Sequence, residues 1–301
     1  MTINELKSVI GENSAAVEKK LSEKLDLIKI DTAYPVFSSL EKSMRYSLEA
    51  GGKRIRPCLV IEFSKLFGGS LESAIDYACS IEMIHTFSLI HDDMPCMDDD
   101  DMRRGKPSNH VLFGEATALL AGDSLLAYAF ETLDSPILSD AQNLSAHKVL
   151  AHFTGPCGMC AGQQIDLESE NKIITFDTLK ILHSKKTGAL IKCSCILGCI
   201  AAGKSIGSDE YLAACKYSEN IGLAFQIADD ILDVVGDEKK LGKKCGSDQK
   251  DGKNTSVSLL GIDKAKSFAQ ELTDKAKKSI SKYDGSGFLC ALADYIITRD
   301  N

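Results

Sequence analysis

Apolar residues recur every three or four positions along most of the chain, which is the spacing of one face of an α-helix. The pattern is clearest in three stretches, 71–93, 115–133 and 209–236. Strand-like alternation is scarce. Glycine or proline interrupts the pattern at 51–52, 68–69, 134–136, 155–156 and 203–204. The sequence therefore predicts an all-α fold of about ten or more helices. No linker or short repeat divides it, so we expect one domain over residues 1–301.

Composition narrows the class of protein. The chain has 301 residues, of which 44% are hydrophobic and 26% charged, as in a folded globular protein. Its net charge is −8 and no basic stripe stands out, which argues against a nucleic-acid partner. The charged N-terminus lacks an apolar signal core. The longest largely apolar run, 193–203, is shorter than the roughly 20 residues of a membrane span. We expect a cytoplasmic protein with no membrane span.

Eleven cysteines are scattered along the chain, several of them in apolar helical stretches. Without an export signal, reduced thiols that pack as small hydrophobic groups are the expectation. Cys157 and Cys160 form a CxxC pair. A redox motif would require a βαβ context, and a zinc site would require a second matching pair. Neither is visible, so packing is favoured for these two cysteines as well.

The segment HDDMPCMDDDDMRR, residues 91–104, crowds six aspartates together ahead of two arginines. Adjacent carboxylates repel one another unless a cation lies between them. Mg²⁺ commonly binds one or two carboxylates and completes its shell with water and phosphate oxygens. An EF-hand loop is excluded, because a loop starting at Asp92 lacks the glycine and the glutamate that its sixth and twelfth positions require. The segment is therefore a candidate magnesium site.

A second acidic group lies in FQIADDILDVVGD, residues 225–237. At about 100° per residue, Gln226, Asp229, Asp230 and Asp233 share one face of a helix. A single group of this kind would ordinarily be a solvated face. Two such groups in one helical chain, both set in apolar sequence, favour metal binding instead.

Basic residues accompany both groups. Arg103 and Arg104 follow the first, and other cations lie in GGKRIRP (51–57), SKKTGAL (184–190) and LGKKCGS (241–247). His85, seven residues before Asp92, lies on the same helix face, either as a core residue or as a functional one. Cations beside acidic metal sites suit a polyanionic substrate, with metal bridging carboxylate and phosphate.

These motifs, in this order, resemble those of the trans-isoprenyl diphosphate synthases, most closely the bacterial-type farnesyl diphosphate synthases. The resemblance runs from about Glu41 through the C-terminal ALADYIITR and is weaker before it. It implies a large helical bundle with a central cavity, usually a homodimer. It also implies condensation of isopentenyl diphosphate with dimethylallyl or geranyl diphosphate by ionisation, condensation and elimination. The product would be farnesyl diphosphate.

The resemblance carries roles to matching positions. It implies three Mg²⁺ ions, held by Asp92, Asp93, Asp98, Asp229 and Asp233. It implies contacts to the allylic diphosphate from Arg103, Lys186, Thr187, Gln226 and Lys243. It implies contacts to isopentenyl diphosphate from Lys53, Arg56, His85 and Arg104. The glycine-rich polar segment 236–255 is then either a lid over the diphosphate or an ordinary exposed loop.

The length of the prenyl product should depend on the helix that precedes Asp92. Phe87 lies about 7.5 Å deeper along the axis, and the small Ser88 lies close to the azimuth of Asp92. Phe87 is therefore either the floor of the product cavity or an ordinary core residue. In the family, an aromatic residue here, together with the two extra residues between Asp93 and Asp98, resembles the farnesyl-producing type. Geranylgeranyl diphosphate synthesis and a non-catalytic, synthase-like partner subunit are the alternatives. A plain Mg²⁺-binding scaffold would not require the basic motifs.

Overall fold

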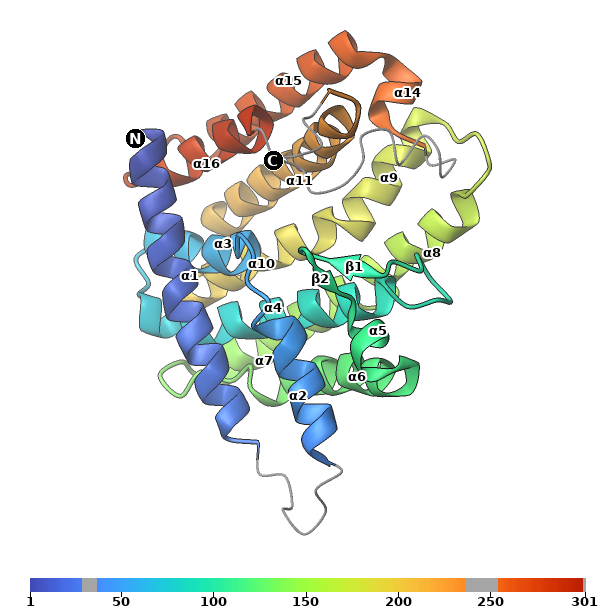
Figure 1. The fold of residues 1–301 in the computed structure, drawn as a ribbon. Helices are drawn as coiled ribbons and strands as arrows, with labels where there is room; N and C mark the ends of the chain where they lie inside the picture. Colours follow the sequence, from blue (N-terminus) through green and yellow to red (C-terminus); the bar gives the residue numbers. More distant parts are fainter. Residues whose placement is uncertain (29–36, 236–253, 300–301) are drawn as a thin grey trace.

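A computed structural model describes residues 1–28, 37–235 and 254–299 of the chain (Figure 1). Within these residues the fold is all-α except for one antiparallel hairpin of two short strands, β1 (Met102–Arg103) and β2 (Lys106–Pro107). The helices of the N-terminal half are α1 (Ile3–Asp26), α2 (Phe37–Leu48), α3 (Ile55–Leu66), α4 (Leu71–Asp92), α5 (Asn109–Phe113), α6 (Glu115–Glu131) and α7 (Asp140–Thr154). Those of the C-terminal half are α8 (Met159–Ser169), α9 (Phe176–Lys186), α10 (Gly188–Ala201), α11 (Asp209–Val235), α14 (Ser256–Leu260), α15 (Ile262–Ile280) and α16 (Gly287–Thr298). The prediction of an all-α fold is confirmed.

Helix α10 lies at the centre of the bundle. It packs against α3, α4, α7 and α11, and each of its residues except Lys192 is buried. A helix that is apolar on all sides belongs inside a protein. Two hydrophobic clusters meet at this helix: one surrounds α4 and α6, and the other joins α11 to α15 and α16. Helix α10 therefore joins the two halves of the core.

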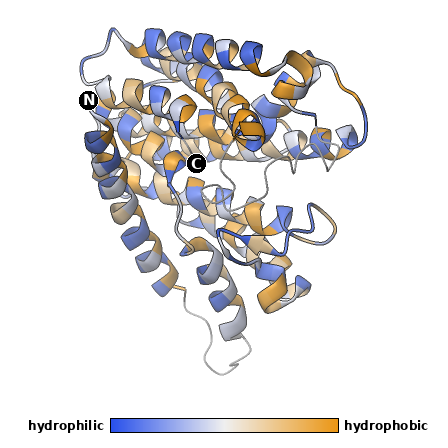
Figure 2. Cartoon of the chain, turned by 45° about the horizontal axis from the view of Figure 1, so that its top comes forward, coloured by the Kyte–Doolittle hydropathy of each residue, from blue (hydrophilic) through white to orange (hydrophobic). Residues whose placement is uncertain are grey.

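The peripheral helices are amphipathic. Helix α1 buries a stripe that includes Leu6, Val17, Leu21 and Leu25 and exposes most of its remaining residues. Figure 2 shows hydrophilic and hydrophobic residues mixed along the outer helices. No helix within the described ranges is long and apolar enough to cross a bilayer.

Helix α4 begins at a capping box, in which Ser70 accepts the backbone N–H of Ser73 and Ser73 accepts that of Ser70. This start fixes the helical register. Asp92 consequently falls on its last turn, and Asp93 caps its C-terminal end.

Candidate active site

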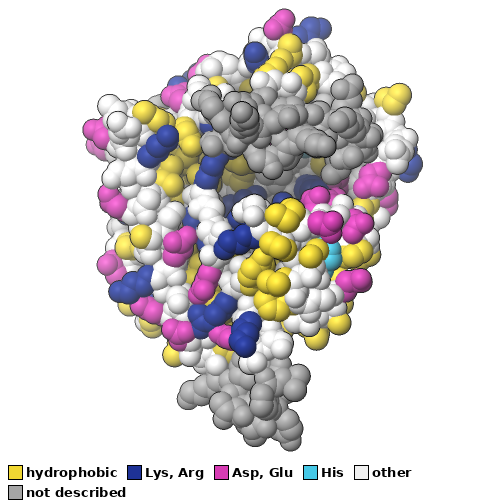
Figure 3. All heavy atoms as spheres, viewed as in Figure 1, with side chains coloured by type: hydrophobic (Ala, Val, Ile, Leu, Met, Phe, Trp, Pro, Cys, Tyr) yellow, Lys and Arg dark blue, Asp and Glu magenta, His cyan; other side chains and the backbone are white. Residues whose placement is uncertain are grey.

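A cavity of about 890 Å³ opens between α4, α8, α11 and the start of α10. Figure 3 shows a hollow on one face of the molecule, with basic side chains along its inner edge and acidic side chains beside it. Twelve of the residues singled out from the sequence line the cavity: Arg56, His85, Phe87, Ser88, Asp92, Asp98, Arg103, Lys186, Thr187, Gln226, Asp229 and Asp233. Segments far apart in the sequence thus converge on one space.

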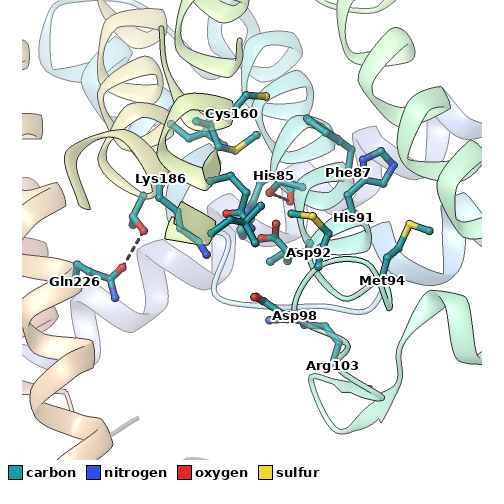
Figure 4. A pocket seen from close by; sticks show the side chains of 18 of the residues that line it. His85, Phe87, His91, Asp92, Met94, Asp98, Arg103, Cys160, Lys186 and Gln226 are labelled. Carbon is teal, nitrogen blue, oxygen red and sulfur yellow. Dashed lines mark hydrogen bonds between the residues drawn. The ribbon is translucent and has the colours of Figure 1, made fainter. Parts of the chain in front are cut away.

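The C-terminal half of α4 supplies one wall. His85, Ser88 and Asp92 recur at helical spacing and line the cavity. Figure 4 shows His85 and Asp92 on this wall. Burial raises the pKa of Asp92 to about 6; Lys186 opposes this shift and Asp98 adds to it. Because burial disfavours the charged form of this carboxylate, a bound cation would stabilise it.

Asp93, the neighbour of Asp92, faces away from the main cavity. It is 2% exposed, and its carboxylate accepts hydrogen bonds from Arg103, whose Nε lies 2.8 and 3.2 Å from the two oxygens. A paired, bidentate arginine has a fixed orientation. The structure therefore gives Asp93 the role of orienting Arg103, which does line the cavity. Its role as a metal ligand stays a prediction.

Helix α11 supplies the opposite wall through Gln226, Asp229 and Asp233. The expectation that Asp230 shares this face is wrong. Asp230 is 3% exposed, accepts the backbone N–H of Ser256 at 2.6 Å and lies 3.6 Å from His183 Nε2. The face predicted from the sequence covers a wide arc of α11. Asp230 lies at the side of this arc against which α14 packs.

Arg299, near the C-terminus, forms an ion pair with Asp229 that the sequence reasoning missed. Its guanidinium carbon lies 4.0 Å from the centroid of the Phe225 ring, and its side chain is 4% exposed. The segment ALADYIITR carries this arginine, but its contact crosses 70 positions and has no local signal.

Lys186 and Thr187 lie where α9 passes into α10. Lys186 donates to Asp166 of α8 at 2.5 Å. Thr187 donates to Gln226 at 2.8 Å (Figure 4). Although burial lowers the pKa of Lys186, Asp166 outweighs it and the pKa is raised. Asp166 was not predicted, because its pairing with Lys186 arises from the crossing of two helices. Lys243 and most of the segment 236–255 lie outside the described residues.

A second basic group lies where α3 packs against α4, and it also lines the cavity. Arg56 Nη1 lies 3.2 Å from His85 Nε2, and burial, with Arg56 next, lowers the pKa of His85 well below its ordinary value. Neutral His85 therefore accepts a hydrogen bond from Arg56. Burial also lowers the pKa of Lys53, and Arg299 adds to the effect. The crowding of cations favours an anionic ligand.

Arg104 and Lys53 are not among the residues lining the main cavity. Arg104 lines a small adjoining cavity and donates to the carbonyl of Gly51. Gly52 has a φ of +132°, and a Cβ there would lie 2.9 Å from the Arg104 guanidinium carbon. The double glycine thus lets the backbone approach Arg104 closely.

The described cysteines are buried, half-buried (Cys215 and Cys290) or exposed. Cys58, Cys79, Cys193, Cys195 and Cys199 are buried, as expected. Cys157 and Cys160 are both exposed, in and after the turn that leads into α8, so the packing interpretation is wrong for this pair. Cys160 lines the cavity with Cys96.

The donor set of the cavity fits magnesium. Within the described ranges, no three His, Cys, Asp or Glu side chains gather closely enough to hold a metal without other ligands. Mg²⁺ does not require such a group, because it retains waters and binds substrate phosphates. Asp92 and Asp98 on one wall and Asp229 and Asp233 on the other offer the hard oxygen ligands it prefers.

The chain thus has an all-α fold and a cavity with carboxylates on facing walls. Comparison with known proteins shows which family combines these features. The polyprenyl synthetase family matches residues 37–284, and the chain belongs to this family of prenyltransferases. A farnesyl diphosphate synthase of Escherichia coli is 47% identical over 266 residues, covering 86% of this chain and 89% of the relative. A geranylgeranyl diphosphate synthase of Cyanophora paradoxa is 46% identical over 268 residues, covering 86% and 87%. The crystal structure of geranylgeranyl pyrophosphate synthetase from Pyrococcus horikoshii superimposes with a TM-score of 0.88 at 32% identity, over 98% of this chain and 99% of the other.

Proposed function

We propose that the chain is a Mg²⁺-dependent farnesyl diphosphate synthase, which condenses isopentenyl diphosphate with dimethylallyl and then geranyl diphosphate. The observation that carries the proposal is the single cavity that unites two aspartate groups, Lys186 and the Arg56–His85 pair. Prenyl diphosphate substrates match such a site, because they combine a charged head with an apolar tail.

The basic residues divide between two diphosphates. Arg103 and Lys186, next to the carboxylates of Asp92 and Asp98, would bind the allylic diphosphate. Arg56 and His85, which line the same cavity, would bind isopentenyl diphosphate, with Lys53 and Arg104 beside them. Thr187, held by Gln226, would orient the allylic substrate. Lys243 stays a predicted contact.

The reaction then follows from the charge distribution. Asp92, Asp98, Asp229 and Asp233 would hold Mg²⁺, which would supply Lewis-acid stabilisation to the departing diphosphate. Arg103 and Lys186 add fixed positive charge where negative charge appears as the allylic C–O bond breaks. The isopentenyl double bond attacks the allylic carbon, and a proton leaves the new chain for the released diphosphate. Apolar cavity residues such as Phe87 and Leu190 keep water from the cation.

The decisive experiment is incubation of the protein with isopentenyl diphosphate, each allylic starter and Mg²⁺, followed by chromatography of the dephosphorylated products. We expect mainly the fifteen-carbon alcohol. Absence of any prenyl product from every starter would refute the enzyme assignment and favour a non-catalytic partner subunit.

Geranylgeranyl diphosphate synthesis is the second candidate. It is favoured by relatives of both names at nearly equal identity. Against it stands Phe87, 7% exposed and lining the cavity five residues before Asp92. A twenty-carbon main product in the same incubation would decide for this candidate.

We also propose a homodimer. Exposed apolar side chains on α5, α6 and α7 support this assembly: Val111, Leu112, Leu119, Leu120 and Leu144. Light scattering coupled to size-exclusion chromatography tests it, because a monomer has half the expected mass. Cytoplasmic localisation stays a prediction from the sequence.

A further inference from the structure

One wall of the cavity is made by two rings in contact. Phe87 and His91 lie one turn apart on α4, and both line the cavity. Their ring centroids are 5.5 Å apart with an interplanar angle of 85°, so the rings meet edge to face (Figure 4). Such pairs prefer a defined mutual orientation. The position of the Phe87 ring therefore depends on the position of the His91 ring.

Helix α6 in turn fixes His91. The His91 Nε2–H donates to the backbone carbonyl of Leu119 at 3.1 Å, and Asp123 Oδ1 lies 3.9 Å away. The Asp123 side chain is 57% exposed, so its charge contributes little and the carbonyl is the main anchor. The imidazole is thus held between α4 and α6.

Gly122 makes room for this arrangement. A Cβ at position 122 would lie 2.2 Å from His91 Nε2 and 2.5 Å from its Cδ2, closer than atoms can approach. Any larger residue would push the imidazole away from α6, toward Phe87 and the cavity. The absence of a side chain at Gly122 therefore leaves the space that the His91 ring occupies.

We propose that His91, seated against Gly122, is a positioning residue that holds Phe87 in place and so sets the length of the prenyl chain that the cavity accepts. The inference rests on the proposed function. Without the His91 ring, Phe87 loses its backing, and the cavity extends toward Leu119, which also lines it and is 44% exposed. A product that is longer by one isoprene unit requires that space, because forcing it into an already filled apolar cavity is energetically costly.

The test compares product ratios among variants, with isopentenyl diphosphate in excess. We expect His91→Ala to raise the ratio of products longer than the wild-type main product by roughly tenfold, the low end of what one methylene discriminates in an apolar pocket. His91→Phe keeps a ring against Phe87 but cannot donate to the Leu119 carbonyl, so its ratio should lie between those of the wild type and His91→Ala. A role in joining α6 to α4 alone would lower stability or turnover in His91→Ala without changing the ratio.

A double variant shows whether His91 acts through Phe87. In the Phe87→Ala background, adding His91→Ala should change the ratio no further. Gly122→Ala should act in the opposite direction and shorten the product. If turnover is lost, calorimetry replaces it: His91→Ala should bind geranylgeranyl diphosphate more tightly relative to farnesyl diphosphate than the wild type does.

An unchanged ratio in His91→Ala, or an effect that adds to that of Phe87→Ala, overturns the inference while leaving the synthase assignment intact. A wild-type protein that forms no prenyl diphosphate of any length overturns both.

Discussion

The first aspartate segment contains carboxylates of different kinds. Asp92 and Asp98 line the cavity, Asp93 is paired with Arg103, and Asp101 is exposed at the surface. Their adjacency in the sequence does not separate these roles. The structure separates them because α4 ends at Asp92, so that each following residue points elsewhere.

We therefore predict that Asp92→Ala lowers turnover by at least roughly a hundredfold, as expected when electrostatic stabilisation of the transition state is lost. The helical circular dichroism should be unchanged, because no core packing is removed. Asp101→Ala, in the same acidic run, serves as the matched control and should keep near wild-type turnover. Similar turnover in the two variants would show that Asp92 is not part of the site.

His85 should make stability depend on pH. Burial, together with Arg56, lowers the pKa of His85 well below that of the unfolded chain. Above the unfolded pKa of about 6.5 neither state is protonated. As the pH falls below it, the unfolded chain takes up a proton that the folded protein does not, and stability is lost by up to about 1.4 kcal/mol per pH unit.

Urea unfolding at pH 7.5 and 5.5 measures this effect. The free energy of unfolding should fall more for the wild type than for His85→Gln, which has no titrating ring. An equal loss in both proteins would contradict the assigned pKa shift.

At the scale of helices, the predicted stretches 71–93 and 115–133 correspond to α4 and α6, and 209–236 to α11. They were predictable because burial of a stripe leaves a periodic pattern. The β1–β2 hairpin was not, because two-residue strands leave no pattern to read. Pairs such as Asp166–Lys186 and Arg299–Asp229 were not predictable either, since each arises from the packing of separate helices.

The crossing of α8 and α9 positions Lys186. A Cβ at Gly162 of α8 would lie 2.1 Å from the backbone nitrogen of Lys186, so the helices meet at a distance that only glycine permits. Gly162→Ala should displace Lys186, lowering turnover and destabilising the protein by about 1–3 kcal/mol.

Gly11→Ala is the matched control, because position 11 lies inside α1, is exposed, and has open space around it. It should stabilise the protein by up to about 1 kcal/mol, the difference in helix propensity between glycine and alanine. Thermal unfolding and steady-state turnover of both variants check the pair. Stabilisation by Gly162→Ala would disprove the close crossing.

At the scale of the whole molecule, the fold brings two basic groups to one cavity from different helices. Arg56 comes from α3, and Lys186 from the end of α9. We expect Arg56→Ala to raise the KM for isopentenyl diphosphate roughly tenfold or more, the worth of a charged hydrogen bond. Lys186→Ala should instead lower kcat, because its charge acts on the leaving group.

Kinetics with each substrate varied in turn distinguish the two. Lys65→Ala, an exposed position on the same helix as Arg56, should leave both parameters unchanged. The same kinetic signature in Arg56→Ala and Lys186→Ala would rule out separate sites.

The fold also brings Arg299, which follows α16, next to the cavity, where it is paired with Asp229. If Asp229 is a metal ligand as proposed, a metal ion approaching it would compete with this guanidinium, and the competition would weaken metal binding in the absence of substrate. Removing Arg299 should therefore strengthen it. Because Asp229 is 41% exposed and the pair is partly screened by water, we expect a change in affinity of only about threefold to tenfold.

The measurement is the rise in melting temperature that Mg²⁺ alone produces, since a ligand that binds only the folded state raises stability according to its affinity. The rise should be larger in Arg299→Ala than in the wild type, whatever the starting melting temperatures. Lys277→Ala removes an ion pair with Asp294, 2.8 Å long, between α15 and α16, and should leave the Mg²⁺-induced rise unchanged. An equal rise in Arg299→Ala and the wild type would mean that the metal does not compete with Arg299, and that Asp229 is either not a ligand or binds both at once.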